Sequence, residues 1–257
     1  MTTSPGPSLS ALVAAVAPSA TALVEAATLL PKHPAPFNDA LLEVLRRRVP
    51  RGRVLDPFGG IGMLGRLGPD WQVTSLEIEP EWAIQGWRNG CIEVVVGDAT
   101  RLPFPDGSWP TACTSPCYGN RLADMYAPAD YAKADERRSH RTRRSYTLAL
   151  GRPVAQGSAG KLQFGEDYMA LHRTAAGEIW RVLTPGGPLV INLKDHIRDG
   201  LVVGVCAAWG LMLEAVGFLP SGGEVVPVRG DQNRSRDRSK GLPTVDIEHV
   251  LVFRKPT

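Results

Sequence analysis

The fold class of this chain is decided by one stretch, Arg53-Val54-Leu55-Asp56-Pro57-Phe58-Gly59-Gly60-Ile61-Gly62. Its apolar start is typical of a short buried strand, and glycines follow at positions 59, 60 and 62. Glycines placed directly after a strand and at the opening of a helix let the backbone approach a ligand closely and aim N–H groups at it. We therefore predict a strand, a turn and a helix that together form a nucleotide-type pocket.

Two acidic residues end the next two predicted strands. Gln72 to Glu77 is predicted as a strand, and Glu77 follows the glycines at the distance where a carboxylate accepts hydrogen bonds from ribose hydroxyls. Ile92 to Asp98 is predicted as the third strand, with Asp98 at its end, within reach of an adenine amino group. Three strand ends thus converge on one nucleoside-shaped ligand.

A second motif, Ser115-Pro116-Cys117-Tyr118, follows the short apolar run Thr111-Ala112-Cys113. We interpret this run as the end of a buried strand, so the motif emerges where open α/β sheets place their ligand crevice. The Ser115 hydroxyl and the Pro116 carbonyl can accept hydrogen bonds, and the Tyr118 ring offers a flat face for stacking. These groups suit the binding of an aromatic ring that carries an amine.

The remaining periodic segments complete an α/β fold. Asn38 is placed to cap a helix from Asp39 to about Arg48, with leucines on one face. We expect a seven-stranded, mostly parallel sheet with an antiparallel last strand. The later predicted elements are a helix from Glu166 to Leu183, a buried strand from Pro188 to Asp195, a helix from Leu201 to Val216, and strands at Glu224 to Val228 and Ile247 to Arg254.

Length and composition are those of an ordinary globular protein. The chain has 257 residues, of which 43% are apolar and 21% charged, and its formal net charge of +3 neither demands nor excludes a polyanionic partner. The four cysteines show no CxxC or Cys/His spacing, which favours reduced thiols in the cytoplasm and predicts no structural metal.

We expect residues 1–50 to form N-terminal helices and a His-Pro segment that dock on a catalytic domain at residues 51–257. We expect the Ala- and Leu-rich stretch from Ser8 to Leu30 to form docking helices and not a signal peptide or membrane anchor, because no basic residue precedes Lys32, Pro18 interrupts the run and Glu25 lies inside it. A basic insertion occupies residues of about 122–165.

Two Arg-rich segments are placed to bind a nucleic-acid backbone. The first, residues 136–144, holds five arginines, with Tyr126, Tyr131 and Tyr146 interleaved around it. The second is the loop that joins the last two predicted strands. Arg binds phosphate through two parallel hydrogen bonds and stacks on bases. The candidate nucleic-acid-binding residues are Arg121, Arg137, Arg138, Arg141, Arg143, Arg144, Arg234, Arg236 and Arg238.

The combined motifs resemble the class I S-adenosylmethionine-dependent methyltransferases, and more closely the amino-methyltransferases of DNA found in restriction-modification. Their glycine loop typically reads Asp-Pro-Phe-x-Gly-x-Gly, as at residues 56–62, and their catalytic motif is Ser or Asp, Pro-Pro and an aromatic residue. A His-Pro segment ahead of the loop is similar to His33-Pro34. The resemblance covers roughly residues 32–121 and 177–255.

The resemblance implies a Rossmann-like class I methyltransferase fold, S-adenosyl-L-methionine as cofactor and DNA, double-stranded by preference, as partner. It implies methylation of the exocyclic amine of a flipped base, with cytosine N4 favoured because Ser leads the motif. Its implied catalytic residues are Ser115, Pro116, Cys117 and Tyr118, and its implied cofactor-binding residues are His33, Pro34, Asp56, Pro57, Phe58, Gly59, Gly60, Gly62, Glu77, Asp98 and Ala99.

Two departures keep alternatives open. Cys117 stands where the family usually has a second Pro, and Pro116-Cys117 also has the local form of the nucleophile in cytosine C5 methyltransferases, although no Glu-Asn-Val segment accompanies it. No separate target-recognition domain is left after Lys255, so we expect sequence reading to be minimal or to be done by loops. The alternatives are adenine N6 methylation, cytosine C5 methylation with Cys117 as nucleophile, a small-molecule or protein methyltransferase, and a non-catalytic nucleic-acid-binding module.

The first prediction concerns the Arg-rich insertion. Because arginines that neutralise phosphates release counterions, we expect DNA affinity to fall steeply with salt and the slope to flatten when Arg137, Arg138, Arg141, Arg143 and Arg144 are replaced by Gln. Titrations of labelled DNA at several salt concentrations measure this slope. An unchanged slope in the folded variant would mean that these arginines are ordinary solvated residues and do not contact DNA phosphates.

Overall fold

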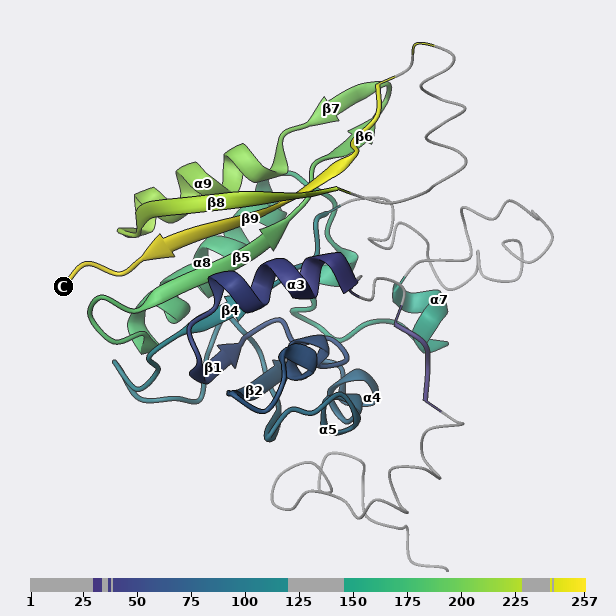
Figure 1. The fold of residues 1–257 in the computed structure, drawn as a ribbon. Coiled ribbons are helices and arrows are strands. Elements are labelled where there is room, and N and C mark those ends of the chain that lie inside the picture. The colour runs from purple at the N-terminus through teal and green to yellow at the C-terminus, as the bar shows by residue number, and fades with distance from the viewer. Residues whose placement is uncertain (1–29, 34–36, 38, 120–145, 228–240, 242) are drawn as a thin grey trace, which may run out of the picture.

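The computed structural model describes residues 30–33, 37, 39–119, 146–227, 241 and 243–257, and a single large sheet runs through it (Figure 1). Several expected features lie outside these residues. They are the N-terminal helices up to residue 29, Pro34, the Asn38 cap, and the candidate arginines Arg121, Arg137, Arg138, Arg141, Arg143, Arg144, Arg234, Arg236 and Arg238.

The sheet has seven strands in the order β3-β2-β1-β4-β5-β9-β8. The first five pair in parallel, whereas β9 runs antiparallel to both β5 and β8, which confirms the predicted fold class. The strands are β1 (Gly52–Asp56), β2 (Trp71–Glu77), β3 (Glu93–Val96), β4 (Ala112–Thr114), β5 (Pro188–Leu193), β8 (Leu219–Pro227) and β9 (Ile247–Arg254).

The strand order reverses between β1 and β4, which are neighbours although β2 and β3 separate them in the chain. Such a reversal opens a crevice outside the carboxyl ends of the two strands, because their connections leave in opposite directions. Leu55 pairs with Ala112, so Asp56 and Thr114 end their strands side by side. The two sequence motifs therefore begin at the same switch point.

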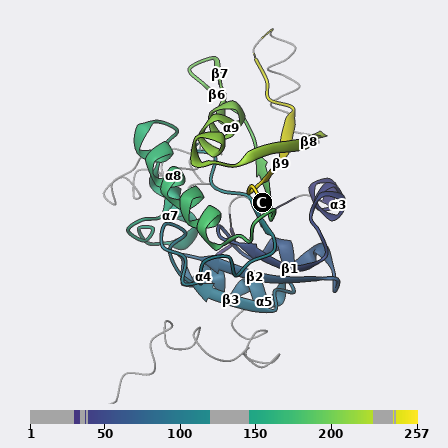
Figure 2. The same cartoon turned by 90° about the vertical axis from the view of Figure 1, so that its left-hand side faces the viewer.

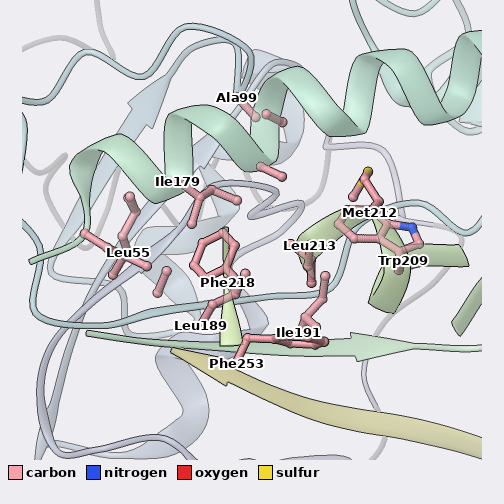
Figure 3. Close-up of a cluster of buried hydrophobic side chains, with 14 of the residues drawn as sticks. Leu55, Ala99, Ile179, Leu189, Ile191, Trp209, Met212, Leu213, Phe218 and Phe253 are labelled. Carbon is pink, nitrogen blue, oxygen red and sulfur yellow. The ribbon is translucent and has the colours of Figure 1, made fainter. Parts of the chain in front are cut away.

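Helices cover both faces of the sheet (Figures 1 and 2). On one face α8 (Glu166–Val182) and α9 (Val205–Val216) pack on the main core, where Ile179, Trp209 and Leu213 meet Leu189 and Ile191 of β5 (Figure 3). The opposite face carries α3 (Asp39–Arg48). The remaining helices are η1 (Met63–Leu67), α4 (Pro80–Ala83), α5 (Gln85–Arg88), α7 (Tyr146–Leu150) and η4 (Ala159–Lys161).

Of the two predicted helices that flank β1, one has the expected form and the other is shorter than expected. The Asp39–Arg48 helix has the predicted bounds and buries Leu41, Leu42 and Leu45, since residues three and four apart share a face. The helix predicted to follow the glycine loop is only η1, a short 3-10 helix with Gly62 at its start in a left-handed conformation, φ 73°. No helix within the described part of the chain has the length and apolar character to cross a membrane.

The predicted helix from Leu201 to Val216 is wrong over its first four residues. Leu201–Val203 forms strand β7, which pairs with β6 (His196–Arg198) in a separate hairpin, and α9 begins at Val205. Asp199 and Gly200 turn the hairpin with φ of 51° and 76°, the paired left-handed conformations of a two-residue turn that Asp-Gly favours. Val202 is consequently 54% exposed and not in the core.

The second prediction concerns a buried hydroxyl in α8. The Tyr168 hydroxyl donates to the Cys117 carbonyl at 2.6 Å and accepts from Trp209 Nε1 at 2.9 Å. Tyr168→Phe leaves both partners unpaired in the interior, so we expect a loss of about 1–3 kcal/mol in unfolding free energy. Urea denaturation measures it, with Thr174→Val on the exposed face of α8 as control. Equal midpoints for wild type and Tyr168→Phe would contradict this role.

Candidate active site

Asp56 joins the ends of the two central strands. Its side chain is 2% exposed, and Oδ1 accepts hydrogen bonds from the Thr114 hydroxyl at 2.7 Å and the Phe58 N–H at 3.3 Å. The Phe58 N–H also reaches Thr114 Oγ1 at 3.2 Å. The turn after β1 is thereby tied to the last residue of β4, directly before Ser115.

The glycine turn packs on Ser75 of β2 and Gly86 of α5 more closely than any side chain would allow. A Cβ added to Gly59 would lie 1.9 Å from Ser75 Oγ, and one added to Gly62 would lie 2.4 Å from the Gly86 Cα. Gly60 has φ 52°. These contacts explain Gly59 and Gly62, where only a bare backbone fits, and the positive φ explains Gly60.

Glu77 holds this turn in place from the end of β2. Its Oε2 accepts the Gly60 N–H at 2.8 Å and its Oε1 accepts the Glu79 N–H at 2.9 Å. Each carboxylate oxygen has two acceptor sites, so Glu77 keeps capacity for a ligand's hydroxyl groups. The residue predicted to bind ribose therefore also fixes the backbone of the glycine turn.

The other predicted cofactor residues differ in burial and in hydrogen bonding. Asp98 lies two residues beyond β3, and its Oδ1 accepts the N–H and the hydroxyl of Thr100, both at 2.8 Å. Ala99 packs its side chain in the main core, and Phe58 is half-buried beside it. Pro57 is buried.

His33 lies over the glycine turn. A Cβ on Gly60 would be 3.4 Å from His33 Nε2. The imidazole meets the rings of Trp82 and Tyr146, with centroids 4.7 and 5.8 Å away. The His-Pro segment is thus brought to the predicted pocket through its histidine.

The Ser115-Pro116-Cys117-Tyr118 loop is organised by a buried amide that the sequence analysis did not assign. Ser115 Oγ and the Tyr118 hydroxyl share a hydrogen bond at 3.0 Å. Asn192 Nδ2 donates to the Tyr118 hydroxyl at 2.7 Å, to Ser115 Oγ at 3.3 Å and to Glu248 Oε2 at 3.1 Å. Asn192 is 1% exposed, so this network holds both side chains from inside the sheet.

The backbone of the same loop is bound by elements far away in the chain. The Gly119 carbonyl accepts the Phe164 N–H at 2.8 Å and an Arg198 guanidinium N–H at 3.0 Å. Gly119 has φ 61°, and a Cβ there would meet the Phe164 nitrogen at 2.5 Å. Together with the Tyr168 bond to Cys117, these contacts fix the loop where it leaves β4.

Cys117 is a protonated thiol in an apolar setting. It packs with Trp82, Tyr146 and Val154, and burial raises its pKa to about 12 despite a hydrogen bond with Tyr146. Tyr146, assigned from sequence to the aromatic residues of the basic segment, is instead 6% exposed in this cluster. Because it contacts both Cys117 and His33, Tyr146 connects the Ser115-Pro116-Cys117-Tyr118 loop with the histidine that lies over the glycine turn.

Arg152 and the residues after it are bound to the acidic residues that follow β2. Its guanidinium donates to Glu81 Oε1 at 2.8 Å and to Glu79 Oε2 at 2.8 Å, and Glu79 is fully buried. Glu79 Oε1 also accepts the Ala155 N–H at 2.7 Å. Gly157 then approaches Asp98, where a Cβ would lie 3.1 Å from Oδ2. Sequence spacing gave no signal for this clamp.

Comparison with known proteins identifies the fold. Neither a protein-family model nor a curated protein sequence matches the chain. The structure of the [4+2]-cyclase SpnF matches at a TM-score of 0.51 and 16% identity, over 92% of this chain and 93% of that one. A candidate methyltransferase from Bacillus halodurans matches at 0.50 and 15% identity, over 84% and 99%. The chain has a Rossmann-like methyltransferase fold.

A candidate DNA modification methylase from Thermus thermophilus matches at 21% identity but with a TM-score of 0.38, over 63% of this chain and 51% of that one, too weak to bear on function. The stronger matches include a cyclase and a methyltransferase, so this fold alone does not decide the reaction. The function must be argued from the site.

A buried carboxyl, Asp56, and a partly buried one, Glu77, give the site an unusual charge state. Burial raises the pKa of Asp56 from 3.8 to about 7, although hydrogen bonds from Thr114 and Phe58 lower it, and burial raises the pKa of Glu77 from 4.5 to about 7 against bonds from Glu79 and Gly60. Both groups therefore titrate near neutrality, and a cation bound beside them would favour their ionised forms.

The third prediction follows from these two pKa values. Since the folded state binds protons more tightly than the unfolded chain, the carboxyls stabilise the protein below about pH 4, and this stability is lost as pH rises towards about 7. The double variant Asp56→Asn/Glu77→Gln should lack this pH-dependent part of the unfolding free energy, which is on the order of a few kcal/mol. Urea denaturation across this pH range measures the difference from wild type.

Burial lowers the pKa of His172 to about 4 in both proteins. Its opposite contribution to the pH dependence of stability therefore cancels when the double variant is compared with wild type. Glu214→Gln, on the exposed face of α9, serves as the charge control. Parallel stability curves for wild type and the double variant would show that Asp56 and Glu77 are ionised in the free protein.

Proposed function

We propose that this chain is an S-adenosylmethionine-dependent methyltransferase that methylates the exocyclic amine of a base in DNA, with cytosine N4 as the favoured target. The observation that carries the proposal is the hydrogen bond between Asp56 and Thr114. It joins a glycine pocket with buried carboxyls to the motif that starts at Ser115. A methyl donor and an amine held at adjacent strand ends are close enough for direct transfer.

The pocket residues fit the cofactor. Gly59 and Gly62 leave only backbone beneath the pocket, Glu77 keeps acceptor sites for ribose hydroxyls, and the carboxyls of Asp56 and Glu77 suit a positively charged ligand. The bound cofactor would supply an electrophilic methyl group on a positively charged sulfur. Residues that would hold it are His33, Asp56, Pro57, Phe58, Gly59, Gly60, Gly62, Glu77, Asp98 and Ala99, with Pro34 outside the described residues.

The motif residues would hold and activate the amine. A hydroxyl has one donor and two acceptor sites, so a Ser115 that donates to Tyr118 and accepts from Asn192 can still accept one hydrogen bond from an amine. The Pro116 carbonyl is the second acceptor. Because positive charge develops on the nitrogen during transfer, these fixed acceptors stabilise the transition state and require no covalent intermediate with the enzyme.

Tyr118 would stack on the base after it leaves the duplex, a step that costs a few kcal/mol in lost stacking and pairing. Its hydroxyl is fixed by Asn192, so the ring is held at one angle without any ordering cost at binding. The Arg-rich segments, outside the described residues, would hold the DNA backbone. Adenine N6 remains the alternative target, since the same acceptors serve either amine.

Cytosine C5 methylation is disfavoured by the surroundings of Cys117. A nucleophilic cysteine needs a thiolate, whereas burial raises the pKa of this thiol to about 12 and its cluster supplies aromatic and apolar neighbours. A binding module without activity is disfavoured because Ser115, Tyr118 and the pocket carboxyls are all held by specific hydrogen bonds.

The fourth prediction tests the atom that receives the methyl group. Mass spectrometry of nucleosides from DNA of cells that express the protein should show N4-methylcytosine. Cys117→Ser should retain it, Ser115→Ala should lower its yield at least tenfold, and Ser221→Ala on the distant strand β8 should not change it. Purified wild-type protein should form no covalent adduct with DNA containing 5-fluorocytosine.

The other outcomes each correct a different part of the proposal. A trapped adduct with loss of activity in Cys117→Ser would replace direct transfer by nucleophilic catalysis at carbon 5. N6-methyladenine would retain the mechanism and change only the base. Unmodified DNA, together with no binding of the cofactor in calorimetry, would overturn the enzyme assignment.

A further inference from the structure

Three side chains outside the candidate active site come together without any sequence motif. Asp195, Cys206 and His249 each offer a ligand atom, and these atoms all lie within 4.8 Å of one another. Asp195 follows the end of β5, Cys206 is the second residue of α9, and His249 is part of β9. The cysteine spacing predicted no structural metal. Spacing along the sequence cannot reveal residues that are distant in the chain and become neighbours only in the folded structure.

The topology explains why they meet. Leu193 pairs with His249 across β5 and β9, so their side chains lie on the same face of the sheet, and Asp195 follows two residues after Leu193. The Cys206 N–H donates to Asp195 Oδ1 at 2.8 Å, which brings the first turn of α9 onto the carboxylate. Figures 1 and 2 both draw α9 beside β8 and β9.

The three donors form a set with a definite metal preference. One sulfur, one imidazole nitrogen and one carboxylate oxygen suit zinc, whose bonds of about 2.0–2.3 Å place tetrahedral ligands about 3.3–3.6 Å apart. Small rotations of the side chains would close the observed triangle to these distances. Cys206 is 9% exposed, whereas Asp195 and His249 are partly exposed, so the sulfur is shielded and an ion can enter from solvent.

We propose that Asp195, Cys206 and His249 form a site for a zinc-type divalent ion, with the fourth coordination position open to water. On binding, the Cys206 thiol loses its proton to solvent and the resulting thiolate forms the metal–sulfur bond. The ion ties the end of β5, the first turn of α9 and β9 together. It lies one residue from Glu248, which accepts the Asn192 hydrogen bond of the catalytic loop.

The test uses the full-length protein after removal of metal with a chelator and dialysis. Calorimetry with Zn²⁺ should show one ion bound per chain, and Co²⁺ should produce the visible spectrum of a tetrahedral site with a thiolate-to-cobalt charge-transfer band. Cys206→Ser should lose this band, and His249→Gln should weaken Zn²⁺ binding at least tenfold. Cys117→Ser, which removes a more exposed thiol than that of Cys206, is the matched control and should leave the band and the affinity unchanged.

Circular dichroism of each variant establishes that it is folded before its binding is compared. No saturable binding to folded wild-type protein would overturn the proposal, as would a charge-transfer band that persists in Cys206→Ser. Because none of these measurements depends on methylation, the site stands or fails independently of the proposed function.

Discussion

The hydrogen bond between the Asp56 carboxyl and the Thr114 hydroxyl is the contact on which the rest of the site depends. It joins the ends of β1 and β4 at the point where the strand order reverses. The glycine turn follows Asp56 and the Ser115 loop follows Thr114, so one buried bond sets the distance between the two binding regions. A carboxyl buried to this degree keeps part of its proton near neutral pH, which makes the same bond responsive to charge in the crevice.

Local patterns predicted most of the sheet because each central strand is a short apolar run that ends at a distinctive residue. Asp56, Glu77 and Ser115 were located at strand ends by this pattern, and the structure describes them there. The β6–β7 hairpin was missed because Leu201 and Val202 satisfy helical spacing with the residues that follow. The Asp199-Gly200 turn, whose left-handed conformations end one strand and start another, was the available signal.

Other parts of the site depend on contacts that no local pattern contains. Asn192 is a single polar residue in an apolar strand, which was a usable signal, but its partners at Ser115 and Tyr118 lie more than seventy positions away. Tyr146 follows an Arg-rich segment and was assigned to it, although packing against Trp82 and His33 buries its ring. In both cases burial and partner choice are tertiary properties, decided by which elements the sheet brings together.

The fixed ends of residues 120–145 have a consequence for how this protein can change. Gly119, before the segment, is held by Phe164 and Arg198, and Tyr146, after it, is buried against Trp82. When two points of a chain are already held, a longer connection between them costs little, about 0.6 kcal/mol for each doubling of its length. The contacts of Gly119 and Tyr146 are made with Phe164, Arg198 and Trp82, so the number of residues between these two positions can change with little effect on the catalytic loop.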